Sequence, residues 1–252
     1  MKILVACEYS GRVRNAFMAR GHDVISCDFL PSEDSSPYHY QGDVRDLLAD
    51  QDFDLMICHP PCTYLSVSGL HWNTRGILVD GKPRAELTEE ALDFVRLLMS
   101  ANVPRIALEN PVSCISSRIR KPDQVVQPWW FGEDASKATC LWLKNLPKLK
   151  PAGNECAPRL VCCGSVLPEG VGKHGCPNCN GEKTAKPRWG NQTDSGQNKL
   201  APSPDRWKER SRTYQGIADA MADQWGSLGV LAGAESGRDC GHKKQSSIFE
   251  LL

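Results

Sequence analysis

The sequence contains no apolar run of about 18 residues, the length needed for a membrane-spanning helix. Its first residues also lack the small-residue cleavage site of a secretory signal peptide. No internal repeat is visible, and the formal net charge is zero, so overall charge neither favours nor excludes a nucleic acid partner. We therefore expect a cytoplasmic globular protein without a membrane partner.

Charge is nevertheless distributed unevenly along the chain. Residues 144–212 contain 13 Lys and Arg against 6 Asp and Glu, whereas residues 1–143 contain 14 against 19. A basic segment beside an acidic one is compatible with binding of DNA or RNA. The alternative is that these charges form ordinary solvated surface.

Short apolar segments alternate with helical patterns in the first half. Residues 3–7, 24–29, 55–58 and 106–108 are predicted strands, and the clearest helical periodicity covers residues 86–101. Strands separated by helices are typical of the α/β class with a doubly wound, mostly parallel, Rossmann-like sheet.

The composition changes after residue 148. Pro, Gly, Cys and Asn then dominate, and a helical pattern returns only over residues 206–225. We expect a main α/β domain, a small Cys-rich insertion, a returning helix that completes the main domain, and a flexible tail. Their predicted bounds are 1–148, 149–200, 201–228 and 229–252.

Two Pro-containing turns place reactive side chains after predicted strands. Cys62 ends a Pro-Pro-Cys turn, and Glu109 begins a Glu-Asn-Pro turn in which Pro111 is expected to end the strand. Ligands of open α/β sheets bind at such strand ends. A thiol beside a carboxylic acid suits attack on an electron-poor ring that needs a proton elsewhere, such as cytosine.

Each of these residues also has a structural interpretation. A free Cys is most often a buried small hydrophobe, which we expect of Cys58 inside the strand. The prolines before Cys62 favour a thiol that faces the crevice instead. Glu109 could alternatively cap a helix or form a surface ion pair.

The ends of the first strands carry candidate cofactor-binding residues. Gly11 permits a close backbone approach, Asp28 can accept hydrogen bonds from two ribose hydroxyls, and Asp43 is a candidate for an adenine amino group. The full Gly-x-Gly-x-x-Gly fingerprint is absent, which favours a nucleoside cofactor without phosphates, such as S-adenosylmethionine. The alternative is that the acids only cap turns. The candidate set is Glu8, Tyr9, Ser10, Gly11, Asp28, Asp43 and Pro60.

Several motifs follow the order found in one known family. They are Ser10-Gly11, Asp28, Asp43, Pro61-Cys62, Glu109-Asn110, the segment 127–142 and the segment 212–218. Together they cover about residues 1–145 and 205–226 and resemble the DNA cytosine carbon-5 methyltransferase family, in particular its short bacteriophage and prophage members. The family's Gln-x-Arg-x-Arg motif is absent, and Lys137 is a candidate substitute.

This resemblance implies a mechanism and its participants. A Cys62 thiolate would attack carbon 6 of cytosine while Glu109 hydrogen-bonds or protonates ring nitrogen 3, and Asn110 would orient the Pro-Pro-Cys loop. It also implies S-adenosylmethionine as methyl donor and DNA as partner, with the target base flipped out or single-stranded. Two alternatives stay open: a methyltransferase of free cytosine nucleotides, and a non-catalytic zinc-ribbon nucleic-acid-binding protein on a methyltransferase scaffold.

Cysteines gather in the predicted insertion. Cys176 and Cys179 form a Cys-x-x-Cys knuckle, and Cys156 with Cys162 or Cys163 can supply a second pair. Four thiolates in a polar, Gly-rich segment favour a structural Zn²⁺ site. The alternatives are His174 as a ligand, an iron–sulfur cluster, or unrelated reduced thiols. The predicted ligand set is Cys156, Cys162, Cys176 and Cys179.

The C-terminal tail contains a further short motif. Residues 245–249, Gln-Ser-Ser-Ile-Phe, look similar to the peptide by which bacterial proteins bind the replicative sliding clamp. A frayed terminus without a partner is the alternative.

Overall fold

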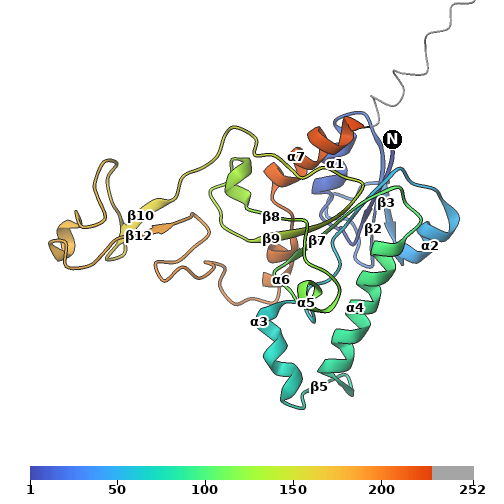
Figure 1. The fold of residues 1–252 in the computed structure, drawn as a ribbon, viewed down its shortest axis with the longest axis horizontal. Helices are drawn as coiled ribbons and strands as arrows, with labels where there is room; N and C mark the ends of the chain where they lie inside the picture. Colours follow the sequence, from blue (N-terminus) through green and yellow to red (C-terminus); the bar gives the residue numbers. More distant parts are fainter. Residues whose placement is uncertain (229–252) are drawn as a thin grey trace, which may run out of the picture.

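The computed structural model describes residues 1–228, and the clamp-like peptide at residues 245–249 lies outside the described residues. A seven-stranded sheet forms its centre, in the order β3-β2-β1-β4-β7-β9-β8 (Figure 1). Neighbours from β3 to β7 are parallel, whereas β9 is antiparallel to β7 and to β8. The predicted fold class, a mostly parallel Rossmann-like sheet, is therefore confirmed. The strands are β1 (Lys2–Ala6), β2 (Asp23–Asp28), β3 (His39–Gln41), β4 (Leu55–Cys58), β7 (Arg105–Pro111), β8 (Gln124–Val126) and β9 (Thr139–Lys144).

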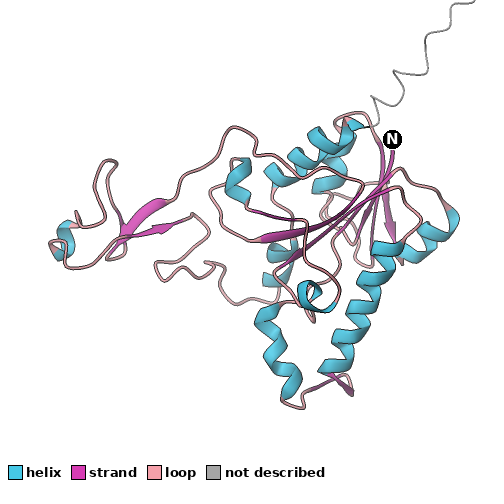
Figure 2. Cartoon of the chain, viewed as in Figure 1, coloured by secondary structure: helices cyan, strands magenta, loops and turns pink. Residues whose placement is uncertain are grey.

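Helices cover both faces of this sheet (Figure 2). One apolar core joins β1 to α1 (Arg12–Met18) and α7 (Gln215–Gly226), and the other joins it to α2 (Val44–Asp50) and α4 (Arg84–Ser100). Neighbouring residues of β1 enter opposite cores, because successive side chains of a strand point to opposite faces. Burial on both faces explains why the central strands are continuous apolar runs.

The single helix expected over residues 206–225 is interrupted. The structure has α6 (Arg206–Ser211), an extended backbone at Arg212 with ψ of 134°, and then α7. At Gly216 an added Cβ would lie 2.1 Å from the carbonyl oxygen of Phe131, so α7 begins in close backbone contact with another segment. Both the break at Arg212 and this contact belong to the folded chain and are not contained in the helical periodicity of the sequence.

A second, three-stranded sheet is built from β10 (Arg159–Cys162), β11 (Ser165–Val166) and β12 (Lys186–Arg188), in the order β11-β10-β12. It extends away from the central sheet in Figure 1, and we call residues 159–188 the arm. Within residues 1–228, no helix is long and apolar enough to span a membrane. The remaining elements are α3 (Val67–Leu70), η1 (His71–Thr74), β5 (Leu78–Val79), β6 (Lys82–Pro83), α5 (Ile115–Arg118), η2 (Pro128–Phe131) and η3 (Pro177–Cys179).

Helix α4 offers a matched test of the second core. Leu98 is 0% exposed and Leu97 is 37% exposed, although they are neighbours on the same helix. Leu98→Ala should lower the free energy of unfolding by about 2–5 kcal/mol, because it leaves a cavity, and Leu97→Ala by about 1 kcal/mol or less. Urea unfolding measures both. Equal losses for the two variants would contradict the described packing of α4.

Candidate active site

The pairing of β4 with β7 sets the position of the candidate catalytic groups. The N–H of His59 donates to the carbonyl oxygen of Ala6 in β1 over 2.9 Å, which keeps His59 in line with β4. On the other side of β4, Cys58 lies opposite Leu108 of β7. His59 and Glu109 therefore stand at the same level on adjacent strands. His59 Nδ1 lies 3.0 Å from Glu109 Oε2, and these side chains are 8% and 9% exposed. Sequence reasoning missed His59, because its contact depends on strand register.

Glu109 lies inside its strand and not after it. β7 continues through Pro111, since β9 pairs with it and places Cys140 opposite Asn110 and Thr139 opposite Pro111. β7 ends at Pro111, as expected, but the prediction that Glu109 follows the strand was wrong. Proline is tolerated here because the pairing with β4 ends at Leu108, so Pro111 has a strand neighbour only on the β9 side.

Asn110 connects this strand to the loop that carries Cys62. Its Nδ2 donates to the carbonyl oxygen of Pro60 over 2.8 Å, and the side chain is buried. The carbonyl oxygen of Cys62 accepts from the N–H groups of Leu65 and Ser66, at 3.1 and 2.9 Å. The half-buried thiol of Cys62 is thus held on a turn that is fixed from both sides.

The surroundings of the site raise the pKa of the Cys62 thiol and lower the pKa of the Glu109 carboxyl group. Burial raises the pKa of the Cys62 thiol, and Glu109 raises it further, while Lys137 and Arg210 lower it. Burial also raises the pKa of Glu109, but the hydrogen bond from His59 and the charge of Lys137 outweigh it and leave the pKa below its usual value. In the resting site the acid is ionised and the thiol is protonated. Arg210 is a further residue that the sequence did not reveal.

The neighbouring thiol of Cys58 is structural, as predicted. It is fully buried in β4, and its Sγ lies 3.5 Å from the carbonyl oxygen of Ala107. Burial raises the pKa of Cys58 far above its usual value, so it remains protonated.

The loop after β1 uses its polar side chains to hold itself in place. Glu8 is buried and accepts from the N–H groups of Val13 and Arg14, at 2.7 and 3.2 Å, which caps α1. Tyr9 donates from its hydroxyl to the carbonyl oxygen of Lys208 over 3.0 Å. Two of the predicted cofactor-binding side chains therefore shape the loop. Gly11, at φ of 71°, provides its turn.

The two predicted acids lie at the ends of adjacent segments. Asp28 ends β2 and accepts from the N–H of Leu30 over 2.9 Å, and Asp43 caps α2 by accepting from the N–H of Arg45 over 2.9 Å. Burial raises the pKa of Asp28, although the charges of nearby groups, among them His59, act in the opposite direction. The capping alternative is thus realised for both acids. Two carboxylates at this end of the sheet suit the hydroxyl and amino groups of a nucleoside better than phosphates.

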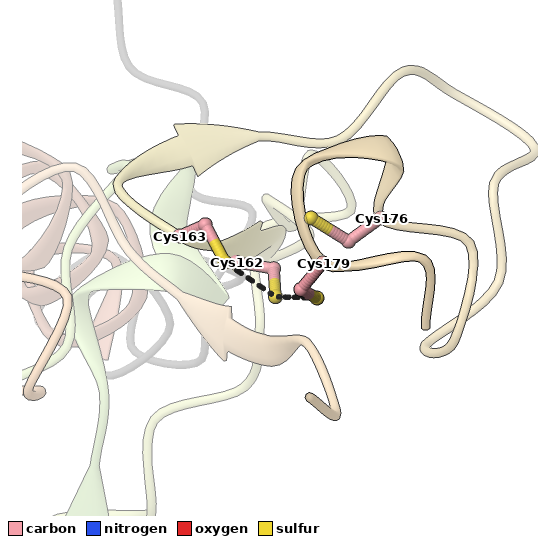
Figure 3. A group of neighbouring side chains, drawn as sticks. All are labelled: Cys162, Cys163, Cys176 and Cys179. Atoms are coloured by element: carbon pink, nitrogen blue, oxygen red, sulfur yellow. Dashed lines mark hydrogen bonds between the residues drawn. The ribbon is translucent and has the colours of Figure 1, made fainter. Parts of the chain in front are cut away.

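The cysteine cluster of the arm has the geometry of a metal site. The sulfur atoms of four cysteines all lie within 4.8 Å of one another (Figure 3). Cys162 Sγ is 3.8 Å from Cys163 Sγ and 3.8 Å from Cys179 Sγ. A tetrahedral Zn²⁺ with Zn–S bonds of about 2.3 Å separates its sulfur ligands by about 3.8 Å. The cluster of Cys162, Cys163, Cys176 and Cys179 is therefore compatible with zinc.

The predicted ligand Cys156 is not in this cluster, and Cys163 takes its place. Cys156 lies before the arm, where its N–H donates to the carbonyl oxygen of Trp129 over 3.0 Å. Cys163 and Gly164 have φ angles of 50° and 77° and form the tight turn between β10 and β11. This turn brings two adjacent cysteines to one centre, which the irregular spacing of the sequence did not indicate.

The base of the arm is fixed to the loop that carries Lys137. Trp189 stacks on Trp129 with ring centroids 5.3 Å apart and an interplanar angle of 13°. Asn191 accepts from the N–H of Ser136 and donates to its carbonyl oxygen, both over 3.0 Å. Ser136 directly precedes Lys137. A displacement of the base of the arm would therefore also displace the Lys137 charge.

Comparison with known proteins shows that the chain is similar in fold to several solved structures. No family model and no curated protein matches the chain. A protein described as a DNA modification methyltransferase encoded within a prophage (E. coli) is similar with a TM-score of 0.37 and 15% identity, over 57% of this chain and 46% of that chain. Spodoptera frugiperda DNMT2 is similar with a TM-score of 0.37 and 17% identity, over 60% of this chain and 53% of that chain. The 16S rRNA methylase RmtB is similar with a TM-score of 0.30 and 17% identity, over 57% of this chain and 55% of that chain. The aligned part spans about half of each structure, and the likeness concerns the fold alone.

The opposing charges around Cys62 predict opposite shifts of its reactivity. Glu109→Gln removes a negative charge and should lower the pKa of Cys62 by about one pH unit, whereas Lys137→Met should raise it. The rate of iodoacetamide modification of the Cys62 peptide, followed by mass spectrometry across pH, measures this pKa. Identical pH midpoints in both variants and the unaltered protein would refute the described electrostatics.

Proposed function

We propose that this chain is an S-adenosylmethionine-dependent methyltransferase that modifies carbon 5 of cytosine in DNA. One observation carries the proposal: the Cys62 thiol, on the loop after β4, lies near enough to the Glu109 carboxylate of the adjacent β7 for the acid to raise its pKa, and Asn110 holds that loop in place. A nucleophile and an acid in this arrangement can activate the two sides of one ring.

Cys62 would act as the nucleophile. Its thiol loses a proton to solvent, the sulfur forms a bond to carbon 6, and the electron pair of the ring double bond moves towards carbon 5. Lys137 and Arg210 favour this step, because their positive charges lower the pKa of the thiol. Glu109 would hold a proton at ring nitrogen 3, so that the ring can accept the displaced electrons.

The strand ends around Asp28 and Asp43 would hold the cofactor. When bound, S-adenosylmethionine supplies an electrophilic methyl group. Asp28 suits the ribose hydroxyls, Asp43 suits the adenine amino group, and the turn at Gly11 permits close approach of the backbone. After methyl transfer, the carbon-5 proton passes to solvent, its electron pair returns to the ring, and the Cys62 thiolate is expelled.

The charge of the arm favours DNA over a free nucleotide as substrate. Its exposed basic side chains can neutralise successive phosphates of a polyanion, whereas a mononucleotide offers only one phosphate group. The exposed basic residues of the arm are Arg159, Lys173, Lys183 and Lys186.

Nucleoside mass spectrometry of a host that expresses the chain tests this function. DNA should contain new 5-methylcytosine with the unaltered protein and with the control Cys156→Ser, but not with Cys62→Ala. The control removes a thiol that lies outside both sites. Methylation confined to free nucleotides would support the nucleotide enzyme, and unmodified cytosine in every pool would refute the proposed reaction.

We further propose that the arm binds one structural Zn²⁺. Apart from cysteines, the buried residues of its small core are Leu167 and Ala185, which is little apolar surface for a folded unit. Metal binding supplies folding free energy in such cases.

Metal analysis of purified variants tests the ligand set. We expect about one zinc per chain in the unaltered protein and in Cys156→Ser, and loss of zinc in Cys163→Ser. A visible absorbance with bound iron would indicate an iron–sulfur cluster instead. Retention of zinc by Cys163→Ser with loss in Cys156→Ser would show that the described cluster is not the site.

A further inference from the structure

His59 is a buried titratable group that the proposed reaction has not yet used. Its Nδ1 lies 3.0 Å from Glu109 Oε2, and its Nε2 is buried without a hydrogen-bond partner among residues 1–228. A buried imidazole with one nitrogen bonded to a carboxylate and the other without a partner lowers the stability of the fold, because a buried polar atom without a hydrogen bond costs free energy. This arrangement therefore points to a role in the chemistry of Glu109.

Three charged or titratable groups on other elements interact with His59 or with Glu109. Glu109 faces it from β7, Asp28 from the end of β2, and Lys137 approaches Glu109 from the loop before β9. Cys62 lies on the loop three residues after His59 and is influenced by Glu109. The imidazole thus contacts Glu109 and also influences the charge of Asp28.

The proposed reaction places contradictory demands on Glu109. The group must present a proton to ring nitrogen 3, yet His59 and Lys137 keep its pKa below the usual value, so at neutral pH it is ionised. A carboxylate can accept a hydrogen bond but has no proton to donate. Another group must hold that proton until the base arrives.

We propose that His59 holds this proton and passes it through Glu109 to ring nitrogen 3 of the bound cytosine. This inference rests on the proposed function. His59 is a positioning and proton-holding residue, because it acts on the substrate through Glu109.

The proton transfers balance over one turnover. As the Cys62 sulfur bonds to carbon 6 and the thiol proton passes to solvent, a proton moves from His59 to Glu109 and on to nitrogen 3, and the ring takes up the displaced electrons. After methyl transfer the carbon-5 proton passes to solvent, and the expelled Cys62 thiolate regains a proton from solvent. Nitrogen 3 then returns its proton through Glu109 to His59. No external oxidant, reductant or further acid is needed.

The decisive variant is His59→Asn, because asparagine can still donate a hydrogen bond to Glu109 but carries no exchangeable charge. We expect kcat for DNA methylation to fall about 100-fold, the lower end of the range for acid–base catalysis, with KM values changed less than about two-fold. The pH profile of kcat should also change, because His59→Asn removes a proton-binding group that contacts Glu109.

A double variant separates this role from a structural one. Glu109→Gln removes the relay, so adding His59→Asn to it should change kcat less than about two-fold. His22→Asn is the matched control, since His22 lies at the opposite end of β2 from Asp28 and should leave the pH profile unchanged. Circular dichroism melting of each variant, with His59→Gln as a second substitution, identifies any loss of folding.

The outcomes are distinguishable. If the unaltered protein makes no 5-methylcytosine, the proposed function fails and this inference fails with it. If the unaltered protein is active and His59→Asn retains its kcat and pH profile, the inference alone is overturned. A folded His59→Asn with reduced kcat but an unshifted profile also overturns it, because only packing would then have changed.

Discussion

The register between β4 and β7 is the constraint on which the candidate active site depends. With Cys58 opposite Leu108, His59 stands beside Glu109, and Asn110 reaches the carbonyl oxygen of Pro60. A shift by one residue would turn every side chain to the other face of the sheet and separate these groups. The apolar side chains of both strands are buried in the two cores, so the packing that stabilises the fold also fixes the chemistry.

The second organising feature is an electrostatic balance around one buried carboxylate. Glu109 raises the pKa of Cys62, and Lys137 lowers the pKa values of both groups. Neutralising Glu109 through a proton from His59 would remove its repulsion of the thiolate at the moment when the sulfur must be ionised. The same proton would thus act on both Glu109 and Cys62, so the proposed proton transfer and the proposed nucleophilic attack are coupled.

Much of the sheet could be predicted because buried parallel strands are short, continuous apolar runs with helices between them. The position of Cys62 after β4 was predicted in this way, whereas Glu109 lies within β7 and not after it. Register and antiparallel pairing are properties of the folded chain, so the contact of His59 and the extension of β7 by β9 could not be inferred. The replacement of Cys156 by Cys163 has the same origin, since a tight turn with two positive φ angles gathers the ligands.

The arm has a consequence for how such chains can diverge. Its strands pair with one another around a small core, and its base is anchored by Trp189 and Asn191. Changes of length or sequence between the two ends of the arm therefore alter the surface it presents while leaving the spacing of His59, Cys62 and Glu109 intact. Under the proposed function, such changes would alter what the arm contacts without altering the reacting groups.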